Sequence, residues 1–215
     1  MSDMRYFGQY ADFKTASKNE GGSLLSADNI IGDSYSVEFR MEDGKNVAWI
    51  VNKFGFDVGY LDARMSYQLD VFKARGWSIN VQLAQVLYSD TPDPGSYWGR
   101  VAVVCAEQRY QKEIDAYLDK LSSSLGKGVL PVIDLSEKGI SEMLAAGGDW
   151  LSEDHLPLEK LPKGTALVKN QRSFTDNMVE QGRKGNKGCY FVSYAFIAIV
   201  IAAVVALGLK IAGVI

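Results

Sequence analysis

Residues 35–61, YSVEFRMEDGKNVAWIVNKFGFDVGYL, decide the fold of this chain. Apolar and polar side chains alternate on both sides of the pair Asp43-Gly44, which is the pattern of two half-buried strands. An Asp-Gly pair supplies the backbone freedom that a tight hairpin turn needs. The stretch therefore predicts a β-hairpin, followed by a further short strand over DVGYL, residues 57–61.

Further strands and a helix follow this hairpin. Residues 63–76 place Met65, Leu69 and Phe72 on one face of a helix that Gly76 ends. Residues 78–89 alternate again, and residues 100–106, RVAVVCA, are apolar on both faces, which is typical of a central strand. We therefore expect a small barrel-like β-module over residues 35–106.

The apolar spacing changes to a helical period after residue 106. The run EQRYQKEIDAYLDKLSSSL, residues 107–125, predicts an amphipathic helix, and VLPVIDL, residues 129–135, predicts a short buried strand. Ser136 can cap a second helix that ends before Gly147-Gly148. These elements form a βαβα-like segment over residues 99–147, so the fold class is α+β, with one domain over residues 35–163.

The segments on either side of this domain have a different composition. Residues 1–34 are rich in Gly, Ser, Asn and Asp with scattered aromatics, and we expect a loosely ordered lead-in whose aromatic side chains dock on the domain. Residues 164–188 contain four glycines and predict a flexible stalk, helical around residues 174–179. Arg183, Lys184 and Lys187 make the end of this stalk basic.

The C-terminal residues 189–215 predict a transmembrane tail anchor. Residues 190–209, YFVSYAFIAIVIAAVVALGL, carry no charge, and 20 helical residues span about 30 Å, the thickness of the bilayer hydrocarbon. Only Lys210 follows, whereas several basic residues precede the run, so the positive-inside rule places the N-terminal domain in the cytoplasm. Ala198, Ala202 and Ala206 recur every four residues, a small-residue stripe on which two such helices can pack as a homodimer.

Charge and cysteine content limit the function classes. Residues 1–168 hold 17 basic and 24 acidic side chains, whereas residues 169–215 hold six and two. The acidic charge of the domain disfavours duplex nucleic acid as a partner, and the basic stalk favours a bilayer with an anionic inner leaflet. Cys105 and Cys189 are too far apart in unlike settings to indicate a disulfide framework or a zinc site. We expect no cofactor and no metal.

Residues 35–107 contain VAWIVN, DVGYL at residues 57–61, a helix that ends in ARGW, and the strand SINVQLAQV. Through these stretches they resemble the HIRAN domain, a small β-barrel module. The family's upstream Asn-Pro-x-Asp-x-Asn-Ala type segment is missing, and MEDGKNVAWIV retains only Asn46 and the small-apolar run. The resemblance implies a barrel, and some members bind single-stranded DNA ends, but no residue here matches a binding motif.

Chemistry-bearing side chains are few. His155 is the single histidine and is flanked by carboxylates, so it is a candidate general base, although a solvated loop residue is the simpler interpretation. Asp134 follows VLPVI at the point where α/β folds place ligands, and either a magnesium site with other aspartates or a helix cap explains it. The further aspartates in question are Asp57, Asp62, Asp90, Asp93 and Asp149.

The sequence favours binding over catalysis. The aromatic side chains of the β-module can stack on bases or on a peptide, although core packing is the commoner role; they are Trp49, Tyr60, Trp77, Tyr97 and Trp98. We predict a tail-anchored protein whose cytoplasmic domain binds or scaffolds a protein partner at the membrane. The alternatives are a membrane-surface, metal-assisted hydrolase and, by the HIRAN resemblance, a binder of single-stranded nucleic acid or peptide.

Overall fold

A computed structural model describes residues 5–91, 93–157 and 160–183. The chain divides into two compact units, residues 1–172 and residues 173–215. Among the described residues, no helix has both the length and the apolar character that a membrane crossing requires. The predicted anchor over residues 189–215 lies outside the described ranges.

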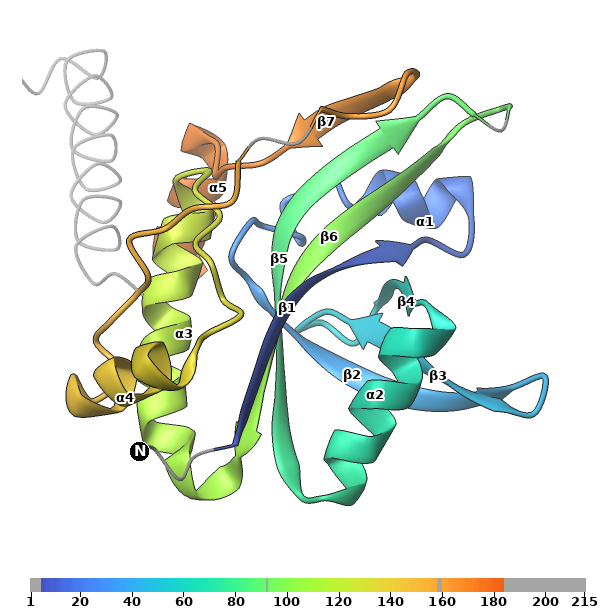
Figure 1. Ribbon diagram of the computed structural model, residues 1–215. Helices are drawn as coiled ribbons and strands as arrows, with labels where there is room; N and C mark the ends of the chain where they lie inside the picture. Colours follow the sequence, from blue (N-terminus) through green and yellow to red (C-terminus); the bar gives the residue numbers. More distant parts are fainter. Residues whose placement is uncertain (1–4, 92, 158–159, 184–215) are drawn as a thin grey trace, which may run out of the picture. The chain divides into compact units, whose positions relative to one another are not determined.

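The first unit is built on a closed β-barrel. Its strands are β1 (Tyr6–Lys14), β2 (Ser34–Glu42), β3 (Lys45–Val51), β4 (Asp57–Leu61), β5 (Trp77–Ser89), β6 (Ser96–Glu107) and β7 (Thr165–Lys169). They follow the order β2-β3-β4-β1-β6-β5-β7, and every pairing is antiparallel. A further pairing of β2 with β5 closes six strands into the barrel, with β7 added beside β5 (Figure 1). The predicted barrel-like module is confirmed.

The hairpin expected around Asp43-Gly44 joins β2 to β3. Glu42 pairs with Lys45, so the loop holds only these two residues. Their φ angles are 46° at Asp43 and 75° at Gly44, the left-handed values that a two-residue hairpin turn with matching twist requires. The turn chemistry and the alternating pattern therefore specify the same register.

The N-terminal segment differs from the expected loose lead-in. Strand β1 pairs with β6 along nine residue pairs and inserts between β4 and β6, so it completes the barrel. Phe13 of β1 is 1% exposed and belongs to the core. The alternation of apolar and polar residues in this strand is weak because of Gly8, Gln9 and Asp12. Its partner strand also lies about 90 residues away along the chain, so no local signal indicates the pairing. Residues 18–23 form the short helix α1 (Lys18–Ser23).

Helices cover the barrel. The expected helix after DVGYL is α2 (Ala63–Ala74), which packs on β3 and β5 and buries Met65, Leu69 and Phe72. After the short 3-10 turn η1 (Gln108–Tyr110), helix α3 (Gln111–Gly126) packs on β5 and β6, on the other side of the strands from α2 (Figure 1). Helix α4 (Glu137–Ala145) begins at Ser136, whose hydroxyl accepts the Gly139 N–H as expected.

Two expected details of the extension differ. Residues 129–135 form one bridge, Pro131 with His155, instead of a strand. Pro131 has no N–H for a ladder, and the hydroxyls of Tyr6 and Tyr10 donate to the carbonyls of Ile133 and Pro131 at 2.9 and 3.0 Å. The start of the expected stalk, residues 165–169, is strand β7.

The second unit begins with helix α5 (Phe174–Arg183), which agrees with the helix expected around residues 174–179. Its first turn is closed by a reciprocal pair of bonds. The Ser173 N–H donates to the Asp176 carboxylate, and the Asp176 N–H donates to the Ser173 hydroxyl, each at 3.0 Å. Arg183, one of the basic residues of the predicted stalk, is the last residue of α5.

Candidate functional site

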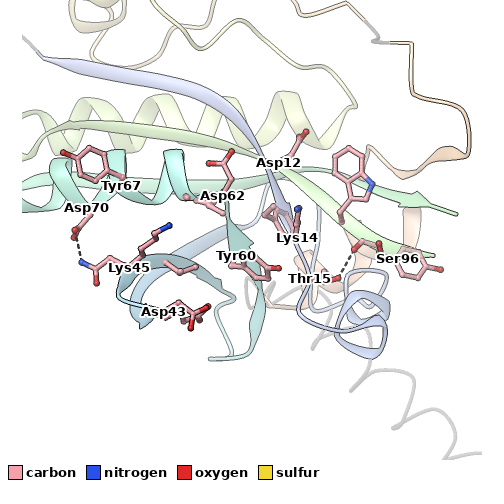
Figure 2. Close-up of a pocket in the computed structure, with 18 of the residues that line it drawn as sticks. Asp12, Lys14, Thr15, Asp43, Lys45, Tyr60, Asp62, Tyr67, Asp70 and Ser96 are labelled. Carbon is pink, nitrogen blue, oxygen red and sulfur yellow. Dashed lines mark hydrogen bonds between the residues drawn. The ribbon is translucent and has the colours of Figure 1, made fainter. Parts of the chain in front are cut away.

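A groove of about 1340 Å³ opens on the barrel beside the short seam between β1 and β4. Only Phe13 with Leu61 and Lys14 with Tyr60 pair across this seam. The labelled lining side chains come from β1, the β2–β3 turn, β4, α2 and the start of β6 (Figure 2). Segments from four separate parts of the sequence therefore meet around one hollow.

Phe13 is the buried residue of β1 beside the groove, and glycines make room for its ring. A β-carbon on Gly99 would clash with the Phe13 ring, and one on Gly59 would clash with both this ring and the Lys14 carbonyl. The glycine in DVGYL therefore serves the close approach of β1 to β4. This explains why a residue without a side chain stands inside a barrel strand.

The lining is predominantly acidic. Five carboxylates and two ammonium groups face the groove: Asp12, Glu42, Asp43, Asp62 and Asp70, with Lys14 and Lys45. Such an arrangement in a partly enclosed hollow attracts cations and repels phosphate-rich ligands.

Most of these carboxylates are held in place. Arg100 donates to both oxygens of Asp12, at 2.6 and 3.2 Å. Asn46 donates to Asp70 at 2.9 Å, and the Trp49 indole donates to Glu42 at 2.5 Å. Asp62 caps α2 by accepting the Met65 N–H at 2.7 Å, which leaves its second oxygen for a ligand. The charge of the groove is therefore preorganised.

Aromatic side chains line the same hollow. They are Tyr60, Tyr67, Tyr97 and Trp98, and Tyr67 on α2 is 72% exposed. The Trp98 indole donates to Ser89 at 2.9 Å, and Thr15 donates to the Tyr97 carbonyl at 2.8 Å, so the β6 end of the groove is fixed. Aromatic faces beside carboxylates suit the alkyl stem and charged head of lysine or arginine.

The structure gathers only part of the residues that the sequence singled out. Tyr60, Tyr97, Trp98 and Asp62 lie in the groove. Trp49 instead packs against Tyr60 with ring centroids 5.3 Å apart, and Trp77 stacks on Phe72 at 4.7 Å. Sequence reasoning missed the groove residues Lys14, Thr15, Tyr67 and Asp70; the acidic and aromatic residues of α2 that face away from Met65 and Leu69 were the available signal.

Asp134 and His155 lie elsewhere. Asp134 lines a smaller cavity of about 330 Å³, whose other carboxylate, Asp12, is bound by Arg100. His155 is in the bridge with Pro131 and is not part of that lining. Ser136, not Asp134, caps α4. Within the described ranges, no three or more His, Cys, Asp or Glu side chains come together in a way that would hold a metal ion.

Cys105 is an unreactive core residue. It is fully buried on β6, and burial raises the pKa of its thiol to about 12. The other singled-out residues Lys184, Lys187, Cys189, Lys210 and the stripe Ala198, Ala202 and Ala206 lie outside the described residues.

Comparison with known proteins gives no relative. No family model, curated protein or solved structure matches this chain. The groove itself is therefore the guide to function.

Proposed function

We propose that this chain is a membrane-anchored binding protein whose groove takes a basic segment of a protein partner. The observation that carries the proposal is the lining, which combines four exposed or half-buried aromatic residues with five carboxylates against two lysines; Arg100 pairs with one of the carboxylates, Asp12, and the lining stays net negative. A lysine or arginine side chain gains both a carboxylate and an aromatic face there.

The size of the groove supports an extended segment as the ligand. A hollow of about 1340 Å³ exceeds the roughly 300–1,000 Å³ of small-molecule pockets, and it runs from the β2–β3 turn to the β5–β6 end. Several consecutive side chains of a partner fit within it. The expected salt dependence is strong, because exposed charges are screened within about 8 Å at physiological ionic strength.

The anchor part of the proposal rests on the sequence. The uncharged run at residues 190–209 and the basic flank before it favour a bilayer helix with the groove-bearing unit on the cytoplasmic side. A groove on such a unit would recruit its partner to the membrane surface.

Single-stranded nucleic acid is the second candidate. A barrel is what the HIRAN resemblance implies, and Tyr60, Tyr67 and Trp98 offer stacking faces beside Lys14 and Lys45. The excess of carboxylates opposes a phosphate backbone, so we rank this candidate below a basic peptide. The hydrolase alternative has weaker support, because the other carboxylate that lines the Asp134 cavity, Asp12, is already bound by Arg100.

A titration of the full chain in lipid nanodiscs tests the proposal. Three probes of equal length are compared: a lysine-rich peptide, its glutamate counterpart and a single-stranded oligonucleotide. Tryptophan fluorescence reports binding, because Trp98 lines the groove. We expect saturable binding of the basic peptide alone, weakened by salt.

A charge-matched pair of variants locates the binding. Asp70→Asn should weaken the basic peptide about fivefold, on the order of one solvent-screened charge pair. Glu153→Gln removes an exposed carboxylate outside the groove and should leave the affinity unchanged. Preference for the oligonucleotide, or equal effects of the two variants, would overturn the basic-peptide assignment.

A further inference from the structure

The turn between β3 and β4 presents two phenylalanines to solvent. Its sequence from residue 52 is Asn-Lys-Phe-Gly-Phe, and Phe54 and Phe56 are 47% and 65% exposed. The turn is held by Asn52, which is itself 6% exposed. A fixed turn that exposes two large apolar rings to water indicates an interaction surface.

Most backbone N–H groups of this turn are hydrogen-bonded within the turn. The Asn52 side-chain oxygen accepts the N–H groups of Phe54 and Phe56, each at 3.0 Å. The Gly55 N–H donates to the Asn52 carbonyl and the Asn52 N–H donates to the Phe56 carbonyl, both at 2.9 Å. Entry into an apolar environment is opposed by unsatisfied backbone groups, and these four bonds reduce that penalty by using the N–H groups of Phe54, Gly55 and Phe56.

The charges next to the turn are paired. Lys53 contacts Asp33 at 2.7 Å, and Arg40 donates twice to Asp57 at 2.7 Å and once to Glu38 at 2.8 Å. Moving the tip into a lipid interface therefore brings no lone cation with it. Glu38 leaves one net negative charge, so attraction to anionic lipid is not part of the contact.

The anchor proposed above would hold this turn close to a bilayer. Between Arg172, the last residue of the first unit, and the apolar run that starts at Tyr190 lie Ser173, α5 and residues 184–189. The ten residues of α5 span about 15 Å, and the seven others reach at most about 25 Å. The first unit therefore stays within about 40 Å of the lipid, where the effective concentration of bilayer surface is high.

We propose that Phe54 and Phe56 insert into the membrane interface and dock the barrel on the bilayer that anchors it. This inference rests on the proposed anchor. The groove and the turn lie at opposite ends of β3, since Lys45 lines the groove and Val51 leads into the turn. Docking by the turn would leave the groove directed away from the lipid.

A lipid-borne quencher tests the contact on the full chain. Cys189 is replaced by serine, Cys105 is buried, and an environment-sensitive fluorophore is attached at Phe56→Cys. The matched control is Met41→Cys, which is 69% exposed and pairs with Asn46 at the far end of β3. The chains are placed in zwitterionic nanodiscs with and without nitroxide-labelled lipid.

We expect quenching and a blue shift at position 56 but not at position 41, with no effect of added salt. Phe54→Ser in the position-56 background should lower the ratio of inserted to withdrawn turn roughly tenfold, as loss of one ring's burial implies. Equal quenching at positions 56 and 41 would overturn the docking while leaving the anchor intact. Elution of the chain apart from the nanodisc would overturn the anchor, and the docking with it.

Discussion

The guanidinium of Arg40 on β2 donates two hydrogen bonds of 2.7 Å to the carboxylate of Asp57 on β4, across the intervening strand β3. The bonds favour the ionised carboxyl, so they lower the pKa of Asp57 below its ordinary value. The pair thus joins the first and third strands of the meander from its outer face.

Replacement of Asp57 tests how much this pair stabilises the fold. Because the pKa is lower in the folded than in the unfolded chain, the stabilisation is complete above the unfolded value and is lost as the pH falls through the folded one. Asp57→Asn should lower stability at neutral pH by no more than about 1 kcal/mol, since solvent screens the exposed pair. The difference should vanish in acid.

Urea unfolding at a series of pH values measures this difference. A double-mutant cycle with Arg40→Gln separates the pair from the loss of either side chain alone. Additive effects of the two substitutions would show that the contact contributes nothing.

Gly59 is required by the close approach of β1 to β4. In Gly59→Ala the new methyl group meets the Lys14 carbonyl, a backbone atom that cannot turn aside, so we expect a loss of about 3 kcal/mol in the free energy of unfolding. The control is Gly22→Ala in α1, where nothing lies within 4 Å of the added β-carbon. That variant should be neutral or more stable by up to about 1 kcal/mol. Equal urea midpoints for the two variants would refute the packing argument.

Cys105 should not react with thiol reagents while the barrel is folded. Burial raises its pKa to about 12, so at pH 8 the thiolate is scarce and the sulfur is also covered. Mass spectrometry of the Cys189→Ser chain after exposure to a maleimide should show no adduct under native conditions and one adduct in urea. Prompt native labelling would place Cys105 outside the core.

Asp62 caps α2 and, in the proposed function, also binds the ligand, and conservative substitutions can separate these roles. Asparagine caps helices as well as aspartate does, so Asp62→Asn should keep the stability while lowering affinity for the basic peptide about fivefold. Asp62→Ala should weaken binding and also cost about 1 kcal/mol in stability, through loss of the bond to the Met65 N–H. If Asp62→Asn binds the peptide like the parent chain, this carboxylate is only a cap.

The sequence predicts those parts of the fold whose contacts are local. The β2–β3 hairpin, β4, α2, α3 and α4 each carry a local pattern, and local signals mark several of their boundaries: the turn Asp43-Gly44, the helix stop Gly76 and the helix start Ser136. For strands that are adjacent along the chain, the turn and the alternating pattern are enough to specify the register of pairing.

The remainder depends on partners distant in sequence. Strand β1 has a weak alternation and is specified by its nine pairs with β6, and β7 by its pairing with β5 about 80 residues earlier. The groove could not be predicted for the same reason, because its lining comes from segments that are distant in sequence. Tyr60 and Trp98 are visible as aromatic residues, but only barrel closure brings them to Lys14 and Asp62.

The seam between β1 and β4 is one of the two shortest pairings of the barrel. β1 shares nine pairs with β6 but only two with β4, and β2 with β5 likewise shares two, so parting the β1–β4 seam disrupts far less of the ladder than parting β1 from β6. Lys14 lies on one side of this seam, Tyr60 on the other, and both line the groove. A ligand that contacts both sides would therefore stabilise the closed seam. By thermodynamic linkage, any change that stabilises the closed seam must also raise the affinity for that ligand. Amide hydrogen exchange at Lys14 and Tyr60 should slow when the basic peptide is bound, and unchanged exchange there would show that closure and binding are independent.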